Sequence, residues 1–148
     1  MASARGCPVP DDRLYEIENM LWYRRRDDGL VEVGITAVAV AMARKVIAIT
    51  PKRSGRPIEG GQAVAVVESG KLVASARTPF AAYVVESNED LLDRPDMINR
   101  DPYGTWVVIL RFDDWDAVKA RLHPADAAAR AFERRMDEEN FKGCGEAP

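Results

Sequence analysis

The sequence predicts a mainly β protein of the α+β type, a sandwich or flattened barrel with small helices and a helical C-terminal extension. Between residues 13 and 112, short runs rich in Val, Ile and aromatic residues alternate with turn residues, which is typical of such folds. After residue 113 the apolar residues take helical spacing. A chain of 148 residues is most simply one domain, and it can bury a core without a metal or disulfide.

The first elements follow from local signals. Residues 1–12 contain several Pro and Asp residues, and we expect a flexible N-terminal tail there. Residues 14–25 predict a strand or a strand plus turn, and Asp27–Gly29 turns the chain into a second, alternating strand at 30–33. Thr36 is expected to cap a short helix, because its side-chain oxygen can accept a hydrogen bond from a free N–H of the first turn.

Strands and helices then follow in a regular order. The pattern predicts, in sequence, a buried strand at 46–49, a hairpin over 63–76, a strand at 80–85, helical character at 88–98 and a core strand at 106–110. Asp113 is expected to cap one helix, and a second helix is expected over 126–140. Ala128, Phe132 and Met136 are spaced four apart on one face of that second helix.

Composition and charge exclude several classes of function. The net charge is −3 with both signs mixed, which argues against a nucleic-acid partner. Apolar runs are too short to span a membrane and the first residues lack the apolar core of a signal peptide, so we expect a cytoplasmic protein. The only histidine, His123, precedes Pro124 and has no ligand pattern around it. We therefore expect no zinc site and no histidine-dependent nucleophile.

The most informative stretch is the predicted hairpin. Small and β-branched residues before Glu68-Ser69 predict one strand, and a similar run from Leu72 predicts the next. Gly70-Lys71 therefore lies at the tip of the hairpin. Gly would supply the positive φ that tight hairpin turns demand. A lysine at this place is held out by a stiff scaffold, as a carrier needs if one enzyme acylates the amine and another uses the cargo. The plain alternative is an exposed turn lysine.

Four short motifs occur in a fixed order between about Leu21 and Phe112: Val33-Gly34-Ile35-Thr36, Glu68-Ser69-Gly70-Lys71, Ser87-Asn88-Glu89 and Asp101-Pro102-Tyr103-Gly104. Their residues and spacing resemble the glycine cleavage system H protein family. The resemblance implies a lipoyl/biotinyl-type flattened β-barrel over residues 13–112, with residues 113–148 as a helical C-terminal extension. The Asp-Pro-Tyr-Gly motif is also a turn signature in its own right.

The resemblance implies that Lys71 carries lipoate through an amide bond, and biotin is the nearest rival cargo. It implies that Glu68 takes part in recognition by the lipoate-attaching enzyme, with Ser69 and Gly70 completing the motif. Gly70 and Leu72 depart from the family's Val and Ala. These changes lie where partners dock, so they bear on partner identity.

The two cysteines leave alternatives open. Cys7 and Cys144 lie near opposite ends of the chain. We favour two free thiols in mobile tails, because a reducing cytoplasm disfavours a permanent bond. In that case replacing both with serine would shift the melting temperature little. The alternative is redox use, in which the cysteines bond each other or meet a sulfur-bearing substrate.

The function that the resemblance implies is a carrier rather than an enzyme. The Glu-Ser-Gly-Lys motif, the Cys7-Pro8 pair and the helical tail are most similar to the H-like lipoate-binding proteins of sulfur oxidation, which work with a heterodisulfide-reductase-like complex. The alternatives are a glycine cleavage H protein carrying an aminomethyl group, and an interaction module without lipoate. The other implied partners are lipoate-attaching and lipoyl-synthesising enzymes and dihydrolipoamide dehydrogenase.

Overall fold

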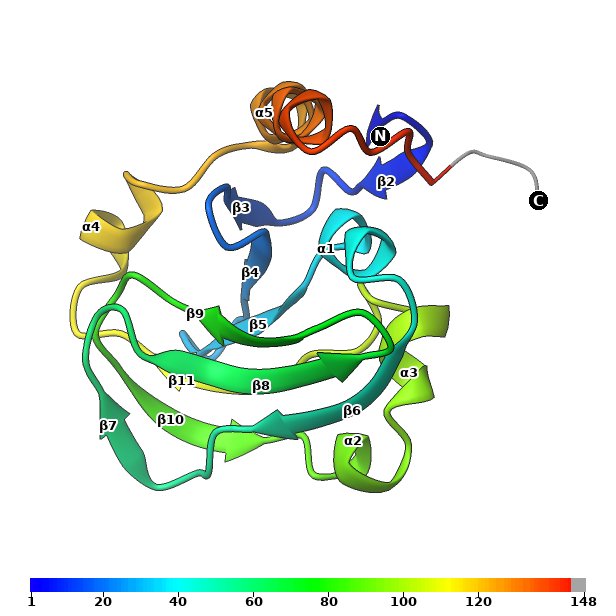
Figure 1. Ribbon diagram of the computed structural model, residues 1–148. Helices are drawn as coiled ribbons and strands as arrows, with labels where there is room; N and C mark the ends of the chain where they lie inside the picture. Colours follow the sequence, from blue (N-terminus) through cyan, green and yellow to red (C-terminus); the bar gives the residue numbers. More distant parts are fainter. Residues whose placement is uncertain (145–148) are drawn as a thin grey trace.

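Three antiparallel sheets organise the chain in the computed structural model, which describes residues 1–144 (Figure 1). The strand orders are β1-β2, β3-β4-β5-β11-β10-β7 and β6-β8-β9. The strands are β1 (Ala2–Ala4), β2 (Cys7–Val9), β3 (Leu14–Glu16), β4 (Leu21–Arg25), β5 (Val31–Ile35), β6 (Val46–Pro51), β7 (Arg56–Ile58), β8 (Ala63–Ser69), β9 (Val73–Arg77), β10 (Ala82–Ser87) and β11 (Val108–Arg111). The helices are α1 (Ala37–Met42), α2 (Asp90–Asp93), α3 (Asp96–Arg100), α4 (Trp115–Lys119) and α5 (Ala125–Glu138).

The main core lies between the six-stranded and three-stranded sheets. Buried side chains such as Leu21, Val33, Val64, Val84 and Leu110 form one continuous cluster there. In Figure 1 the β6-β8-β9 sheet lies in front of the larger sheet. This arrangement confirms the predicted mainly β class, although the sheets pack against each other without closing into one hydrogen-bonded barrel.

Most local predictions hold, and the differences have local causes. Thr36 caps α1 by accepting a hydrogen bond from the N–H of Ala39 at 3.2 Å. The helical stretch at 88–98 is divided into α2 and α3, because the residue before Pro95 is driven out of helical geometry. The cap of α4 is Asp114 rather than Asp113. The short strand β7 was not predicted.

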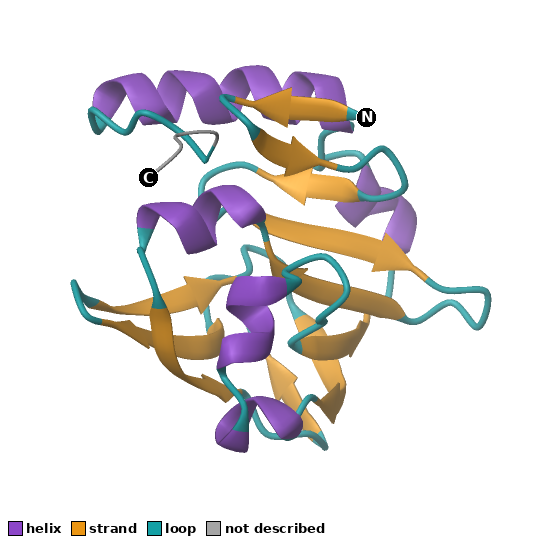
Figure 2. Ribbon diagram, turned by 90° about the vertical axis from the view of Figure 1, so that its right-hand side faces the viewer, coloured by secondary structure: helices purple, strands orange, loops and turns teal. Residues whose placement is uncertain are grey.

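The N-terminal segment is not a flexible tail, so that prediction is wrong. Strands β1 and β2 form a hairpin whose turn residues, Arg5 and Gly6, both have positive φ, as a two-residue type I′ turn requires. Ala4, Cys7 and Val9 are completely buried. Their partner is α5, which lies across the N-terminal strands in Figure 2. The hairpin is ordered because this contact buries its apolar face.

Helix α5 follows the predicted apolar stripe. Ala128, Phe132 and Met136 are all fully buried, and they pack with Tyr15 and Trp22 in a second core. The predicted extension therefore belongs to the folded body up to residue 144, and its residues 145–148 lie outside the described part. Among residues 1–144, no helix is long and apolar enough to span a bilayer.

Gly34 allows close packing of Trp22 across β4 and β5, where the two residues are paired. A Cβ at Gly34 would lie 2.3 Å from two ring carbons of Trp22. The ring cannot move easily, because it is buried, its Nε1 donates to the carbonyl of Pro102 at 3.1 Å, and the Arg13 guanidinium stacks on it at 4.5 Å.

Replacing Gly34 with alanine should therefore lower the free energy of unfolding by about 1–3 kcal/mol through overpacking. Denaturant unfolding measures the change. The matched control is Gly70→Ala, because a Cβ at Gly70 meets no atom within 4 Å. Equal stability of the two variants would contradict this account of the Gly34 site.

Three tyrosines make folding sensitive to alkali. Burial raises the pKa of Tyr103 to about 12 from an ordinary 10, and burial also raises the pKa values of Tyr15 and Tyr23. A raised pKa means that the folded state holds its phenol protons after the unfolded chain has lost them. The associated stability is complete below pH 10 and is lost as the pH rises from about 10 through 12.

We expect the melting temperature to fall steeply over this pH range, together with the appearance of tyrosinate absorbance. Tyr23→Phe should make the fall shallower. Tyrosinate absorbance equivalent to all four tyrosines of the chain near pH 10, while the chain remains folded, would show that the buried phenols ionise freely.

Candidate functional site

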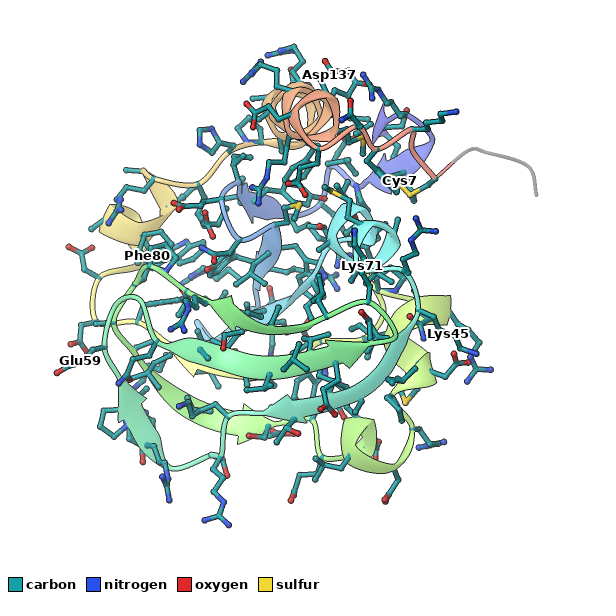
Figure 3. All side chains as sticks on the ribbon, in the orientation of Figure 1. Cys7, Lys45, Glu59, Lys71, Phe80 and Asp137 are labelled. Carbon is teal, nitrogen blue, oxygen red and sulfur yellow. A yellow bond between two sulfur atoms is a disulfide. The ribbon has the colours of Figure 1, made fainter. Side chains whose placement is uncertain are left out.

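The predicted hairpin forms, with Lys71 at its tip (Figure 3). Glu68 pairs with Val73 across β8 and β9, and the N–H of Ser69 donates to the carbonyl of Leu72 at 2.8 Å. Gly70 and Lys71 are left as a two-residue loop. The Lys71 side chain is exposed and has no hydrogen-bond or ion-pair partner among residues 1–144.

Ser69 organises this loop. Its Oγ accepts hydrogen bonds from the backbone N–H groups of Lys71 at 3.1 Å and Leu72 at 3.2 Å, and its side chain is buried. Gly70, by contrast, does not have a positive φ, so the expectation that this glycine supplies left-handed backbone is wrong. The turn is closed by a serine side chain instead, which fixes the place from which Lys71 extends.

A cleft of about 300 Å³ opens beside Lys71. It lies between the hairpin, α1, the start of β4 and the last turn of α5. Much of its lining is apolar: Met20, Leu21, Ile35, Val40, Met42 and Leu72. A flexible chain attached to the Lys71 amine has an apolar surface within its immediate reach.

Of the four charged residues at the cleft, Arg135 and Glu139 pair with each other, whereas Glu18 and Lys71 form no ion pair among residues 1–144. The Arg135 Nε donates to the Glu139 carboxylate at 2.6 Å, and its Nη1 donates to the backbone carbonyl of Glu18 at 3.0 Å. Arg135 and Glu139 both line the cleft. These contacts connect α5 to the loop after β3 and hold one wall of the cleft in place.

Glu68 lies apart from this cleft. It is exposed on the outer face of β8, where Val66 and the cross-strand neighbour Val73 are exposed too, at 41% and 67%. Next to them Leu72 is 39% exposed at the tip. The four predicted motif residues therefore divide: Ser69 stabilises the loop, Gly70 and Lys71 form its tip, and Glu68 belongs to a partly apolar outer surface.

Sequence reasoning missed the cleft residues. Met20, Met42, Arg135 and Glu139 come from three separate parts of the chain, and none carries a local motif. The only available signal was the apolar stripe of α5, which predicts that the helix packs but not where it docks.

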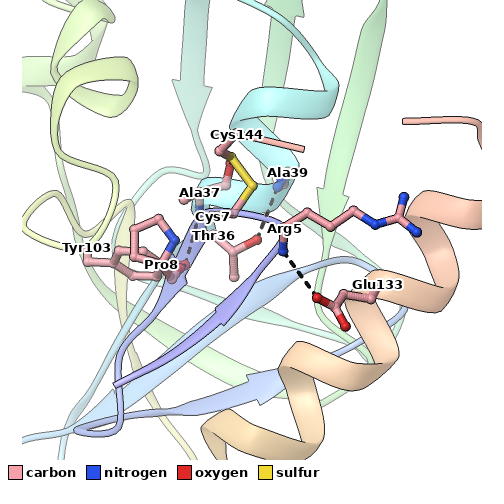
Figure 4. The surroundings of a disulfide bond; sticks show 9 residues. All are labelled: Arg5, Cys7, Pro8, Thr36, Ala37, Ala39, Tyr103, Glu133 and Cys144. Carbon is pink, nitrogen blue, oxygen red and sulfur yellow. Dashed lines mark hydrogen bonds between the residues drawn. A yellow bond between two sulfur atoms is a disulfide. The ribbon is translucent and has the colours of Figure 1, made fainter. Parts of the chain in front are cut away.

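Cys7 and Cys144 form a disulfide with a Cα–Cα distance of 4.8 Å (Figure 4). The favoured prediction of two free thiols is wrong, and the alternative of a bond between them is what the structure contains. The segment after α5 turns back, and the N–H of Cys144 donates to the carbonyl of Arg5 at 3.0 Å. Cys7 is carried to the same place by the N-terminal hairpin, so the tails meet because both are packed.

His123 makes a structural contact through its backbone. Its backbone forms a β-bridge with Tyr15, with both hydrogen bonds at 2.9 Å, and the residue is exposed. It therefore helps to connect α4 and α5 to the sheet.

The mainly β fold and the exposed lysine at a hairpin tip suit a carrier domain. The family model described as "Glycine cleavage H-protein" matches residues 13–135. The chain belongs to this family, whose members are carriers with lipoate covalently attached to a lysine. Family membership confirms the recognised resemblance and lipoate as the cofactor.

Individual relatives agree with this assignment. The chain is 37% identical over 149 residues to "Glycine cleavage system H protein 5" of Aquifex aeolicus, covering 98% of this chain and all of the relative. It is 34% identical to "Probable glycine cleavage system H protein 3" of Saccharolobus solfataricus, covering 86% and 91% of the two chains. The crystal structure of a glycine cleavage system H protein from Mycobacterium marinum superimposes with a TM-score of 0.71 at 28% identity, covering 82% of this chain and 97% of that one.

Proposed function

We propose that Lys71 is the lipoyl attachment site and that the chain presents this arm to partner enzymes. The observation that carries the proposal is the exposed Lys71 amine at the tip of a serine-closed hairpin, beside an apolar cleft. Glu68 and its apolar neighbours offer the outer surface to the lipoate-attaching enzyme. The remaining partners would include lipoyl-synthesising enzymes and dihydrolipoamide dehydrogenase.

The described residues suit a lipoyl group. Once attached, the group supplies a disulfide that can be reduced to a dithiol and can bind a carbon or sulfur cargo. Ser69 fixes the origin of the arm, while Met20, Met42 and Leu72 offer it an apolar resting surface that excludes water. Thioether side chains adapt to irregular ligands and interact well with soft, polarisable groups.

The finer proposal is that the cargo is a sulfur group and that the chain serves cytoplasmic sulfur oxidation with a heterodisulfide-reductase-like complex. Aquifex aeolicus proteins named glycine cleavage system H protein 1, 2, 3 and 5 all match this chain. Such multiplicity favours further roles, because one glycine cleavage system needs only one kind of carrier.

Glycine cleavage is the second candidate, and the names of the relatives favour it. In that setting the arm would carry an aminomethyl group from the decarboxylase.

Three measurements test the proposal. Peptide mapping of the chain from its native host should find lipoate on Lys71 alone. Modification at another lysine, or at none under any growth condition, would refute the attachment site. The lipoylated chain should then fail to replace an H protein in the glycine–bicarbonate exchange of glycine decarboxylase, and deletion of its gene should abolish thiosulfate oxidation. Full exchange activity would overturn the sulfur assignment in favour of glycine cleavage.

A further inference from the structure

The Cys7–Cys144 disulfide and the Lys71 cleft lie on different sides of the same short helix, α1. Val40 lines the cleft and also a second hollow of about 650 Å³, and Cys144 lies at the edge of that hollow. The Cys144 Sγ is 3.9 Å from the carbonyl oxygen of Ala37, the first residue of α1. Figure 3 places Lys71 and Cys7 toward the same end of the molecule. The barrier between the two sites is therefore one helix, about 10–12 Å across.

The two cysteines are not equally exposed. Cys7 is completely buried under α5, whereas Cys144 is exposed. Thiol–disulfide exchange begins when a thiolate reaches one sulfur of the bond. Attack on this disulfide must therefore occur at Cys144, with Cys7 as the sulfur that leaves.

The hollow over Cys144 is electrically suited to a thiolate. Arg44, Lys45 and Arg100 line it, against one carboxylate from Asp101. Arg100 is paired with Asp96 at 3.1 Å, but Arg44 and Lys45 make no ion pair among residues 1–144. Nearby cations lower the pKa of an approaching thiol and raise the fraction present as thiolate.

We propose that Cys7–Cys144 is a dithiol-exchange site that accepts two electrons from the reduced lipoyl arm on Lys71; this rests on the proposed function. One thiolate of the dithiol bonds to the Cys144 sulfur, the Cys7–Cys144 bond breaks, and the Cys7 sulfur takes a proton. The second thiol then displaces Cys144, which is protonated in turn. The dithiol is oxidised to a cyclic disulfide, and the two cysteines become thiols. In a reducing compartment, disulfides are usually transient or redox-sensing, which agrees with an exchangeable bond.

The test uses the full chain lipoylated on Lys71, as established by its mass. The arm is reduced with NADH and a trace of dihydrolipoamide dehydrogenase, the reaction is quenched with N-ethylmaleimide, and the Cys7 and Cys144 peptides are quantified. We expect both cysteines to become alkylated, at a rate constant independent of chain concentration. The Lys71→Arg chain should react at least tenfold more slowly. Cysteines that stay bonded while the arm is fully reduced would overturn the proposal.

A second experiment identifies the source of the dithiol and distinguishes failure of the exchange site from failure of the proposed function. Free dihydrolipoamide is added to the Lys71→Arg chain and should open the disulfide. If only free dihydrolipoamide opens the disulfide, the lipoyl arm of the same chain is excluded as the electron donor. A rate constant that rises in proportion to chain concentration would exclude it as well. If no lipoate is found on Lys71 in the native host, the proposed function is wrong, and the reaction with free dihydrolipoamide then tests the exchange site by itself.

The charged hollow has its own matched control. Replacing Arg44 and Lys45 together with glutamine should slow the reaction with free dihydrolipoamide at least threefold. Replacing Arg53 and Arg56, two exposed cations just before and at the start of β7, with glutamine changes the net charge equally and should leave the rate unchanged. Equal rates in both double variants would exclude the hollow as the place of attack.

Discussion

Replacing Lys71 with arginine is expected to abolish lipoylation of the chain while leaving its fold intact. An arginine guanidinium stays protonated at any accessible pH and cannot act as the acylated amine. The Lys71 side chain makes no hydrogen bond or ion pair among the described residues, so its loss should alter the free energy of unfolding by less than about 0.5 kcal/mol. Intact mass after incubation with a lipoate-attaching enzyme measures the first effect, and thermal melting measures the second.

Lys45 provides the matched control. It is another exposed lysine, it lies near the same end of the molecule (Figure 3), and it is the last residue of the loop between α1 and β6. Lys45→Arg should be lipoylated to the same extent as the unchanged chain. Lipoylation that survives in Lys71→Arg and disappears in Lys45→Arg would move the attachment site to Lys45.

Removing the disulfide by replacing Cys7 and Cys144 with serine should lower the melting temperature by on the order of 10 °C under oxidising conditions. The bond closes a loop with a sequence separation of 137, and the chain-entropy model assigns about 5 kcal/mol to a loop of that length. For a chain of this size, each kcal/mol corresponds to about 2–4 °C. The serine pair also loses buried packing at Cys7.

The same measurement with a strong reductant separates the two contributions. In reductant, the melting temperature of the unchanged chain should fall most of the way to that of the serine variant. The remaining difference in melting temperature should come only from the packing at the buried Cys7. A melting temperature that is equal in the two chains without reductant would show that the bond does not form, and would restore the expectation of two free thiols.

These two predictions differ in how far the sequence alone could have supported them. The hairpin around Lys71 was predictable, because its strands are neighbours in sequence and its turn is short. The stripe of Ala128, Phe132 and Met136 was predictable for the same reason: helical spacing is a local signal. Both elements appear in the structure where the pattern placed them.

The N-terminal hairpin, the disulfide and the cleft depend on contacts between distant parts of the chain. Residues 1–12 contain Pro and Asp, which favour loops, yet Ala4, Cys7 and Val9 become buried once α5 packs on them. A local pattern cannot report a partner that is more than 100 residues away. The cleft beside Lys71 was hidden in the same way, because Met20, Met42 and Arg135 meet only in the folded chain.

The disulfide also determines how the molecule would respond to mechanical force. Cys7 and Cys144 lie close to the two ends, so tension applied between the ends passes through one covalent bond and bypasses nearly all of the sheets. While the bond is intact, a protease that unfolds its substrates by pulling on one end must thread two strands of chain at once. Reduction exposes the sheets to the same pull. The redox state of a single bond therefore decides whether tension between the two ends reaches the sheets.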